Sequence, residues 1–226
     1  MKKVPSLREV ISEHLEISQQ QILDVGCGKG GLVRWLTKQR GRVIGLEVQA
    51  GPLKHARGRE PVAQEQFLQG SGGRLPFRDE SFDLVFFSYS LHHIPPAQIR
   101  PALAAAHRIL KPEASLVVIE PLTEGSGFEV QRPVDDETEV LARAYTHLQE
   151  KFGRPLTEHF FAIDSFYQDP AALCQAMLTV DPARQPAIEA HRTELDRRFY
   201  HYGRKSERGY AFEGWSRLNI IGKKAG

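Results

Sequence analysis

The sequence predicts an α/β fold with a seven-stranded, mostly parallel sheet and helices on both of its faces. Short apolar segments alternate with segments of helical periodicity between Gln21 and Glu120. This alternation is typical of buried parallel strands joined by crossover helices. A glycine-rich turn also follows the first apolar segment, and such turns lead from a strand into a helix where nucleotides bind.

The first half of the chain supplies most of the predicted sheet. Leu7, Val10, Ile11 and Leu15 recur at helical spacing, which predicts an N-terminal helix within residues 1–18. Apolar runs then predict strands, and periodic segments between them predict helices. We expect strands over residues 22–25, 43–46, 66–68, 82–87 and 116–119, and helices over 32–40, just after 51–52, and over 97–110.

The pattern changes after Glu120. Residues 121–132 are polar and rich in small side chains, which predicts a loop. Asp135, Asp136 and Glu137 precede a periodic segment, and acids are typical of the first turn of a helix, although they could also bind a cationic substrate. We expect helices over 134–152, 171–178 and 183–202, and strands over 160–166 and 215–222.

Composition limits the class of protein. The 226 residues are 41% apolar and 26% charged, which is ordinary for a soluble globular chain and favours one domain over 1–226. A net charge of +2 predicts no electrostatic attraction to nucleic acid. The two cysteines fit no disulfide framework, and no apolar run is long enough to span a membrane. We therefore expect a cytoplasmic protein, which could form a homodimer.

The most informative motif runs from Asp24 to Gly31. Its glycines satisfy both the G-x-G-x-x-G spacing of dinucleotide sites and the spacing G-x-G-x-G, so the motif alone leaves the ligand open. Glu47 ends the second strand, where an acid accepts hydrogen bonds from ribose hydroxyls in either kind of site. Asp24 would repel a pyrophosphate, which favours a ligand with a cationic or amino-acid part.

Four segments make the pattern specific: ILDVGCGKG, VIGLE, LPFRDESFDLVFFSYSLHHI and HRILKPEASLVVIEP. Together they resemble the class I S-adenosylmethionine-dependent methyltransferases, in particular the group that acts on quinones, sterols and other small molecules. They lie between Ile22 and Pro121, about half of the chain. The resemblance implies the Rossmann-like class I methyltransferase fold. It also implies S-adenosylmethionine as cofactor, S-adenosylhomocysteine as product and a small-molecule methyl acceptor.

The same resemblance implies the cofactor-binding residues. Asp24 and the glycines would contact the methionine part, Glu47 the ribose, and Val48 the adenine. Many relatives carry an aspartate where this chain has Ser71, whose hydroxyl accepts a hydrogen bond without the help of a charge. The full set is Asp24, Gly26, Cys27, Gly28, Gly30, Glu47, Val48, Ser71, Gly72, Leu75 and Ser88.

The acceptor side is less well defined by the sequence. His92 and His93 follow the fourth strand, and either could act as a base or could be structural. Tyr89, His93 and Glu120 are candidates for binding the acceptor, and residues 121–205 would form the variable acceptor-side insertion with its helices. The paired histidines have no third metal ligand at a convincing spacing, so we expect no metal.

Three functions stay open from the sequence. The first is methyl transfer to a small molecule. The second is methylation of RNA or protein on the same fold, which would require a basic surface beside the site. The third is a non-catalytic protein that binds the nucleoside without turnover. A dehydrogenase is less favoured, because a carboxylate at Asp24 disfavours a dinucleotide.

Overall fold

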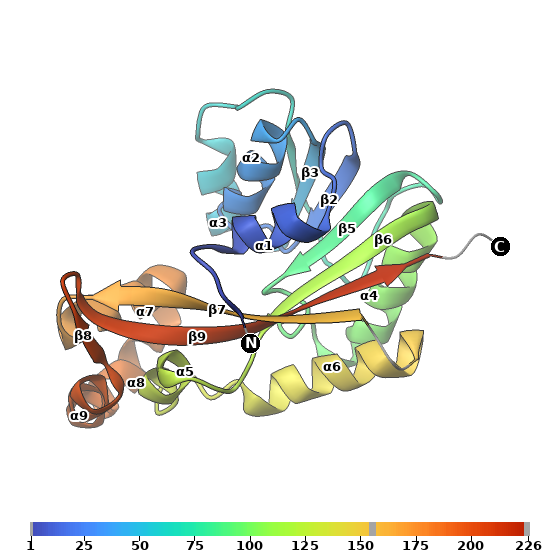
Figure 1. Cartoon of the computed structure of the whole chain (residues 1–226). Coiled ribbons are helices and arrows are strands. Elements are labelled where there is room, and N and C mark those ends of the chain that lie inside the picture. Colours follow the sequence, from blue (N-terminus) through green and yellow to red (C-terminus); the bar gives the residue numbers. More distant parts are fainter. Residues whose placement is uncertain (1, 154–156, 224–226) are drawn as a thin grey trace. The chain divides into compact units, whose positions relative to one another are not determined.

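A computed structural model describes residues 2–153 and 157–223, which divide into two compact units (Figure 1). The larger unit contains Arg8–Glu120, Val140–His159 and the chain from Arg217 onward. The smaller unit contains the N-terminal residues as far as Leu7, together with Pro121–Glu139 and Phe160–Ser216. Each unit is therefore built from segments that lie far apart in the sequence.

Parallel strands form the centre of the larger unit. They are β2 (Gln21–Val25), β3 (Arg42–Glu47), β4 (Gln66–Gln69), β5 (Phe82–Ser88) and β6 (Leu110–Pro121). The strand β2 pairs in parallel with β3 and β5, while β3 pairs with β4 and β5 with β6. The carboxyl ends of these strands consequently meet at one edge, which is where open α/β sheets bind ligands. The predicted parallel sheet is confirmed.

Helices cover both faces of this sheet. They are α1 (Leu7–His14), α2 (Gly31–Lys38), α3 (Ala50–Arg57), α4 (Pro96–Ile109) and α6 (Thr138–Phe152). Leu46 of β3 belongs to the core that also contains buried residues of α4 and α6. Gly45, the preceding residue, faces Val33 of α2 instead. Because successive side chains of a strand point to opposite faces, α2 lies on the face opposite α4 and α6.

Two long strands continue into the smaller unit. These are β7 (Thr157–Tyr167) and β9 (Gly209–Gly222), which run in opposite directions in Figure 1. The hydrogen-bonded order is β1-β7-β9-β6-β5-β2-β3-β4, with β8 beside β9, so the described sheet has nine strands instead of seven. The additions are β1 (Lys2–Lys3) and β8 (Arg204–Ser206), which are too short to produce a periodic pattern.

The prediction of a loop over residues 121–132 was wrong in part. The strand β6 extends to Pro121, and the helix α5 occupies Ser126–Gln131. Gly125 precedes this helix at a φ of 88°, a conformation that favours glycine. The Ser126 hydroxyl accepts a hydrogen bond from the Glu213 backbone N–H at 2.8 Å. A distant strand therefore stabilises a helix that the local sequence does not indicate.

The single helix predicted over residues 183–202 was also wrong. The chain forms a 3-10 turn, Pro182–Arg184, then α8 (Gln185–Ala190) and α9 (Arg192–Tyr202), after α7 (Pro170–Val180). The break falls at His191, whose φ of −106° and ψ of 15° are not helical. The buried apolar residues on these helices and on α5 and β9 form the core of the smaller unit: Val130, Leu173, Cys174, Met177, Ile188, Leu195, Phe199 and Phe212.

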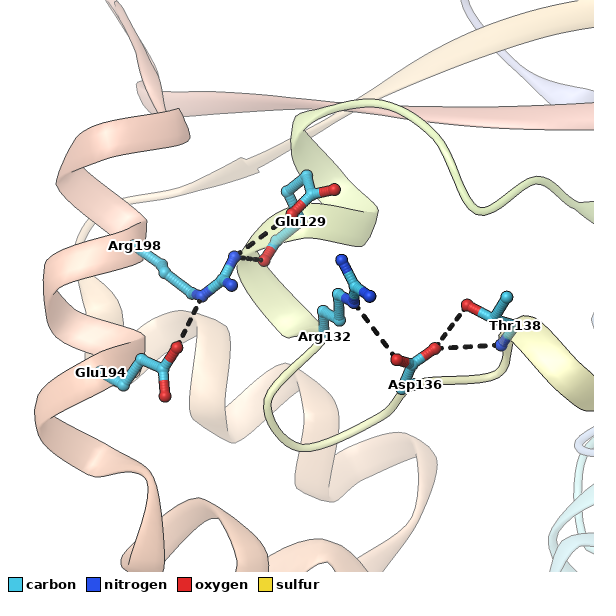
Figure 2. A network of polar contacts seen from close by, with 6 residues as sticks. All are labelled: Glu129, Arg132, Asp136, Thr138, Glu194 and Arg198. Carbon is cyan, nitrogen blue, oxygen red and sulfur yellow. Dashed lines mark hydrogen bonds and ion pairs between the residues drawn. The ribbon is translucent and has the colours of Figure 1, made fainter.

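Polar contacts join α5 and α9 in the smaller unit (Figure 2). Arg198 donates from Nη1 to the Glu129 carbonyl at 2.7 Å and from Nε to Glu194 Oε1 at 3.0 Å. Asp136 accepts from the Thr138 backbone N–H at 3.1 Å and from Arg132 Nε at 3.2 Å. Asp136 therefore caps the start of α6, as expected of an acid at that position.

Candidate functional site

The glycine loop connects β2 to α2 at the carboxyl edge of the sheet. Gly26, Gly28 and Gly30 have φ values of 78°, 54° and 77°, which L-residues with side chains rarely adopt. The Gly26 N–H donates to the Leu46 carbonyl at 2.7 Å, and the Cys27 N–H donates to the same oxygen at 3.0 Å. The loop is therefore attached to the neighbouring strand β3, and its bend requires glycine.

Space around the three glycines differs. A Cβ atom at Gly26 would lie 2.5 Å from Ser90 Cβ, and one at Gly30 would lie 2.6 Å from the Phe67 ring. A Cβ atom at Gly28 would meet no heavy atom within 4 Å. Gly26 and Gly30 are needed for close packing inside the protein. At Gly28, by contrast, the backbone is open to an approaching ligand.

The Glu47 carboxylate at the end of β3 holds this loop in place. Its Oε2 accepts a hydrogen bond from the Gly28 N–H, and its Oε1 accepts one from the Gln49 N–H, each at 2.8 Å. The side chain is buried, with an exposure of 6%. Each carboxylate oxygen has a further lone pair. Glu47 can thus fix the loop and still accept a hydrogen bond from a ligand hydroxyl.

Asp24 at the end of β2 is the second buried acid of the site. It is 2% exposed, and its Oδ1 has no hydrogen-bond partner among the described residues. Burial, and next the negative charge of Glu47, raise the pKa of Asp24 to about 7. A buried acceptor without a donor costs free energy. The site therefore fits a ligand that brings a cation or a hydrogen-bond donor, as the amino-acid part of S-adenosylmethionine does.

Cys27 lies between these two acids in the loop. Its side chain is buried, and burial raises the pKa of the thiol, with smaller contributions from Asp24 and Glu47. The sulfur consequently stays protonated at neutral pH and does not act as a nucleophile. Its role is to fill space beneath the loop, where it packs close to Gly45 of β3.

The remaining residues expected to bind the cofactor differ in exposure. Val48 is 60% exposed directly after Glu47, which is high for an apolar side chain. Leu75 is 3% exposed and belongs to the apolar core of the larger unit. Ser71 accepts a hydrogen bond from the Gly73 N–H at 3.2 Å and so shapes its own turn. Of these three, Val48 offers the most surface to a ligand.

Gly72 and Ser88 complete the predicted cofactor set. A Cβ atom at Gly72 would lie 2.9 Å from Ile94 Cδ1, so this glycine permits close packing in a turn. Ser88 is the last residue of β5 and pairs with Ile119 of β6. Ser88 is therefore at the sheet edge to which the glycine loop also belongs.

The segment after β5 carries the acceptor candidates. Tyr89 has a φ of 54°, and its N–H donates to the Ile119 carbonyl at 2.8 Å. A non-glycine residue in this conformation is strained, and such strain persists where the surroundings enforce it. His93 is exposed, and its ring centroid lies 3.9 Å from that of His92. The exposed ring of His93 can therefore meet a ligand from solvent.

Glu120 of β6 forms a buried pair with His92 of the segment after β5. Glu120 Oε1 accepts a hydrogen bond from the Leu91 N–H at 2.9 Å, and its Oε2 contacts His92 Nδ1. Both residues are buried, with exposures of 5% and 6%. Both carboxylate oxygens are thus occupied by the chain itself. Glu120 resembles Glu47 in using its carboxylate to hold a loop at the end of a strand.

The sequence did not reveal every residue that shapes the site. Ser90 donates from Oγ to the Val25 carbonyl at 2.5 Å, which connects the segment after β5 to the end of β2. Phe67 of β4 packs beneath Gly30. Neither role has a local sequence signal, because each depends on a partner from a distant segment.

Comparison with known proteins decides the family. Residues 23–118 match the family described as Methyltransferase domain. A demethylmenaquinone methyltransferase of Lactiplantibacillus plantarum is 37% identical over 174 residues, which are 70% of this chain and 69% of that protein. The chain belongs to the class I S-adenosylmethionine-dependent methyltransferases. The resemblance seen in the motifs is thereby confirmed.

Two further proteins resemble this methyltransferase, one in part of its sequence and one in its fold. An uncharacterized methyltransferase of Synechocystis sp. is 36% identical over 109 residues, which are 48% of this chain. The chain spans about half of that relative, since the match covers 50% of it. A candidate methyltransferase of Bacillus halodurans superposes with a TM-score of 0.66 at 20% identity, covering 97% of this chain and 99% of that one. The structural likeness shows the fold.

Alanine substitutions at two glycines should separate packing from binding. Both Gly26→Ala and Gly28→Ala place a side chain at positive φ, which costs about 1–2 kcal/mol. Gly26→Ala adds the clash with Ser90, so we expect it to lower the free energy of unfolding more, as measured by urea denaturation. We expect Gly28→Ala to fold and to weaken binding of S-adenosylhomocysteine at least about tenfold, or ~1.4 kcal/mol, by calorimetry. Unchanged binding of S-adenosylhomocysteine by Gly28→Ala would contradict the inference that the ligand approaches the backbone at Gly28.

The raised pKa of Asp24 predicts a pH-dependent stability. Between the ordinary value of 3.8 and the folded value of about 7, the folded protein holds a proton that the unfolded chain has lost. The contribution of Asp24 to the free energy of unfolding therefore falls as the pH rises through this range. We expect Asp24→Asn to stabilise the ligand-free protein by at least about 1 kcal/mol near pH 8 and by little near pH 4. The measurement is urea denaturation across pH, and a difference that does not vary with pH would refute it.

Proposed function

We propose that this methyltransferase binds S-adenosylmethionine at its glycine loop and transfers the methyl group to a small molecule. The observation that carries the proposal is the arrangement of two buried acids beside an open backbone. Asp24 has an oxygen without a donor, Glu47 retains lone pairs, and Gly28 faces free space. A ligand with an ammonium group, ribose hydroxyls and no phosphate matches this set of groups.

Each part of the cofactor has a candidate partner in the larger unit. Asp24 would hold the amino-acid part, and Glu47 the ribose hydroxyls. The exposed face of Val48 would cover the adenine, and Ser71 would accept from its amino group. Gly26, Cys27 and Gly30 would shape the loop around the methionine part, with Gly72, Leu75 and Ser88 bounding the site.

The bound cofactor supplies a methyl group that is already an electrophile, because it is attached to a sulfonium. The protein then has to orient a nucleophile and exclude water, which can provide much of the rate. A base is needed where the acceptor arrives protonated. We assign that role to His93, because it is exposed beside the site, and we assign His92 to holding the segment through its pair with Glu120.

A small molecule is the favoured acceptor. The relative from Lactiplantibacillus plantarum is named for demethylmenaquinone, itself a small molecule. The chain has a net charge of +2, which offers little attraction to a polynucleotide. No helix of the described residues is both long and apolar enough to cross a membrane. We propose a cytoplasmic enzyme acting on one diffusing acceptor, with Tyr89 at the acceptor side.

Removing the Glu47 carboxylate tests the placement of the ribose. We expect Glu47→Ala to weaken binding of S-adenosylhomocysteine at least about threefold by calorimetry. The lost ribose hydrogen bond contributes ~1 kcal/mol, and the loop loses its Gly28 anchor as well. Glu65→Ala is a matched control, since Glu65 also accepts backbone N–H bonds, at Val62 and Ala63, but lies outside the loop. Equal effects of the two variants would place the ribose elsewhere.

Turnover should be measured with the whole chain and methyl-labelled S-adenosylmethionine. A metabolite extract, an RNA pool and a protein pool serve as separate acceptors, and NAD serves as a control ligand. We expect label in a small molecule from the extract. Label in RNA or protein would favour the second function, binding without turnover on any pool would favour a non-catalytic protein, and binding of NAD in place of S-adenosylhomocysteine would overturn the cofactor.

A further inference from the structure

Arg217 of β9 is a largely buried cation of the larger unit that has one long ion pair and no hydrogen bond to a carboxylate among the described residues. Its side chain is 12% exposed, and burial lowers the pKa of the guanidinium. The nearest carboxylate atom that pairs with it, Glu158 Oε1, lies 3.8 Å from Nε, which is too far for a hydrogen bond. Buried cations are normally paired and hydrogen-bonded. The ion pair with Glu158 is thus long, and it leaves the hydrogen-bonding capacity of the guanidinium largely unused.

The guanidinium is nevertheless fixed in position. Its central carbon lies 3.3 Å from the centroid of the Tyr145 ring of α6, so that the cation stacks on the aromatic face. Its Nε donates to Asn219 Oδ1 at 3.1 Å. The Nε edge of the guanidinium is therefore fixed by a hydrogen bond. Within the described part of the chain, the outer nitrogens Nη1 and Nη2 donate no hydrogen bond.

The neighbouring acid Glu158 is satisfied by other groups. Its Oε1 accepts from the Tyr145 hydroxyl at 2.6 Å and from Asn219 Nδ2 at 3.0 Å. These two neutral donors, from α6 and β9, hydrogen-bond Glu158 Oε1, so that Arg217 is not needed to satisfy this oxygen. The donors on the outer side of the guanidinium remain available to a ligand.

Arg217 also lies near the candidate acceptor side. Glu120 is close enough to raise the pKa of Arg217 by its charge. Glu120 belongs to the end of β6, where it holds Leu91 and His92. The strand β9 is also the neighbour of β6 in the hydrogen-bonded order, so Arg217 and Glu120 belong to adjacent strands of the sheet. Among the described residues, Glu120 accepts no hydrogen bond from Arg217, so it does not close off the outer nitrogens.

We propose that Arg217, stacked on Tyr145, binds a planar ionised oxygen group of the methyl acceptor through Nη1 and Nη2. A guanidinium presents two parallel donors that match a carboxylate, and it can likewise donate to a phenolate or enolate oxygen. The acceptor class is thus an organic anion with its charge on oxygen. This inference rests on the proposed function, since it assigns the acceptor of that same site.

Two pairs of probes test the assignment. Benzoate and benzamide have nearly the same shape but differ in charge. At a pH above the pKa of the phenol, 4-nitrophenolate and 4-nitroanisole differ in charge and by one methyl group. Each probe is titrated into the protein by NMR, with and without saturating S-adenosylhomocysteine. We expect at least one anion to bind about tenfold more tightly than its neutral partner, in line with a charge-assisted pair. The pair that discriminates tells a carboxylate from a phenolate.

Variants then assign the discrimination to Arg217. We expect Arg217→Met to bind anion and neutral probe within about twofold of each other, with unchanged affinity for S-adenosylhomocysteine. Tyr145→Phe keeps the ring and should keep the discrimination, whereas Tyr145→Leu removes the stacked surface and should reduce it. Arg217→Lys keeps the charge but removes the two parallel donors of the guanidinium, so we expect it to lose part of the discrimination. This variant replaces Arg217→Met as the test if Arg217→Met does not fold.

Two results would overturn the inference. One is equal binding of anion and neutral probe by the wild-type protein, including no binding of either. The other is discrimination that survives in Arg217→Met. Absence of S-adenosylhomocysteine binding would instead count against the proposed function, and the titrations without it still decide the role of Arg217.

Discussion

The site depends on one interaction, the pair of hydrogen bonds by which Glu47 accepts from the Gly28 and Gln49 N–H groups. The loop between β2 and α2 has three residues at positive φ and little side-chain packing of its own at Gly28. A carboxylate at the end of the next strand supplies the constraint that the loop lacks. Asp24 lies nearby in the same site, where burial and next the negative charge of Glu47 raise its pKa to about 7.

A strand-end carboxylate also holds the segment after β5, on the acceptor side of the site. Glu120 ends β6 and holds the segment after β5 through Leu91 and His92, as Glu47 holds the glycine loop. Two strand-end carboxylates thus fix the two segments that border β5 and β2, while Ser90 connects these segments directly. The two sides differ in the polar groups that they leave available to a ligand. Asp24 offers an acceptor on one side, and Arg217 offers donors on the other.

Most of the sheet could be predicted from the sequence because each buried strand is a continuous apolar run. The glycine loop and Glu47 could be predicted because a glycine motif and a strand-end acid are local signals. The helix α5 could not, since a hydrogen bond from the distant strand β9 stabilises it, and β1 and β8 could not, since they are too short to give a periodic pattern. The stacking between Arg217 and Tyr145 could not be predicted either, because the two residues lie far apart in the sequence.

The central claim is that the carboxyl edge of the sheet accommodates an adenosyl amino acid between Asp24 and Glu47. A crystal structure of the full chain grown with S-adenosylhomocysteine tests it most directly. We expect electron density for the ligand over Gly28, with the ribose at Glu47 and the amino-acid part at Asp24. Density for the ligand at any other place, or protein side chains occupying the space over Gly28, would contradict it.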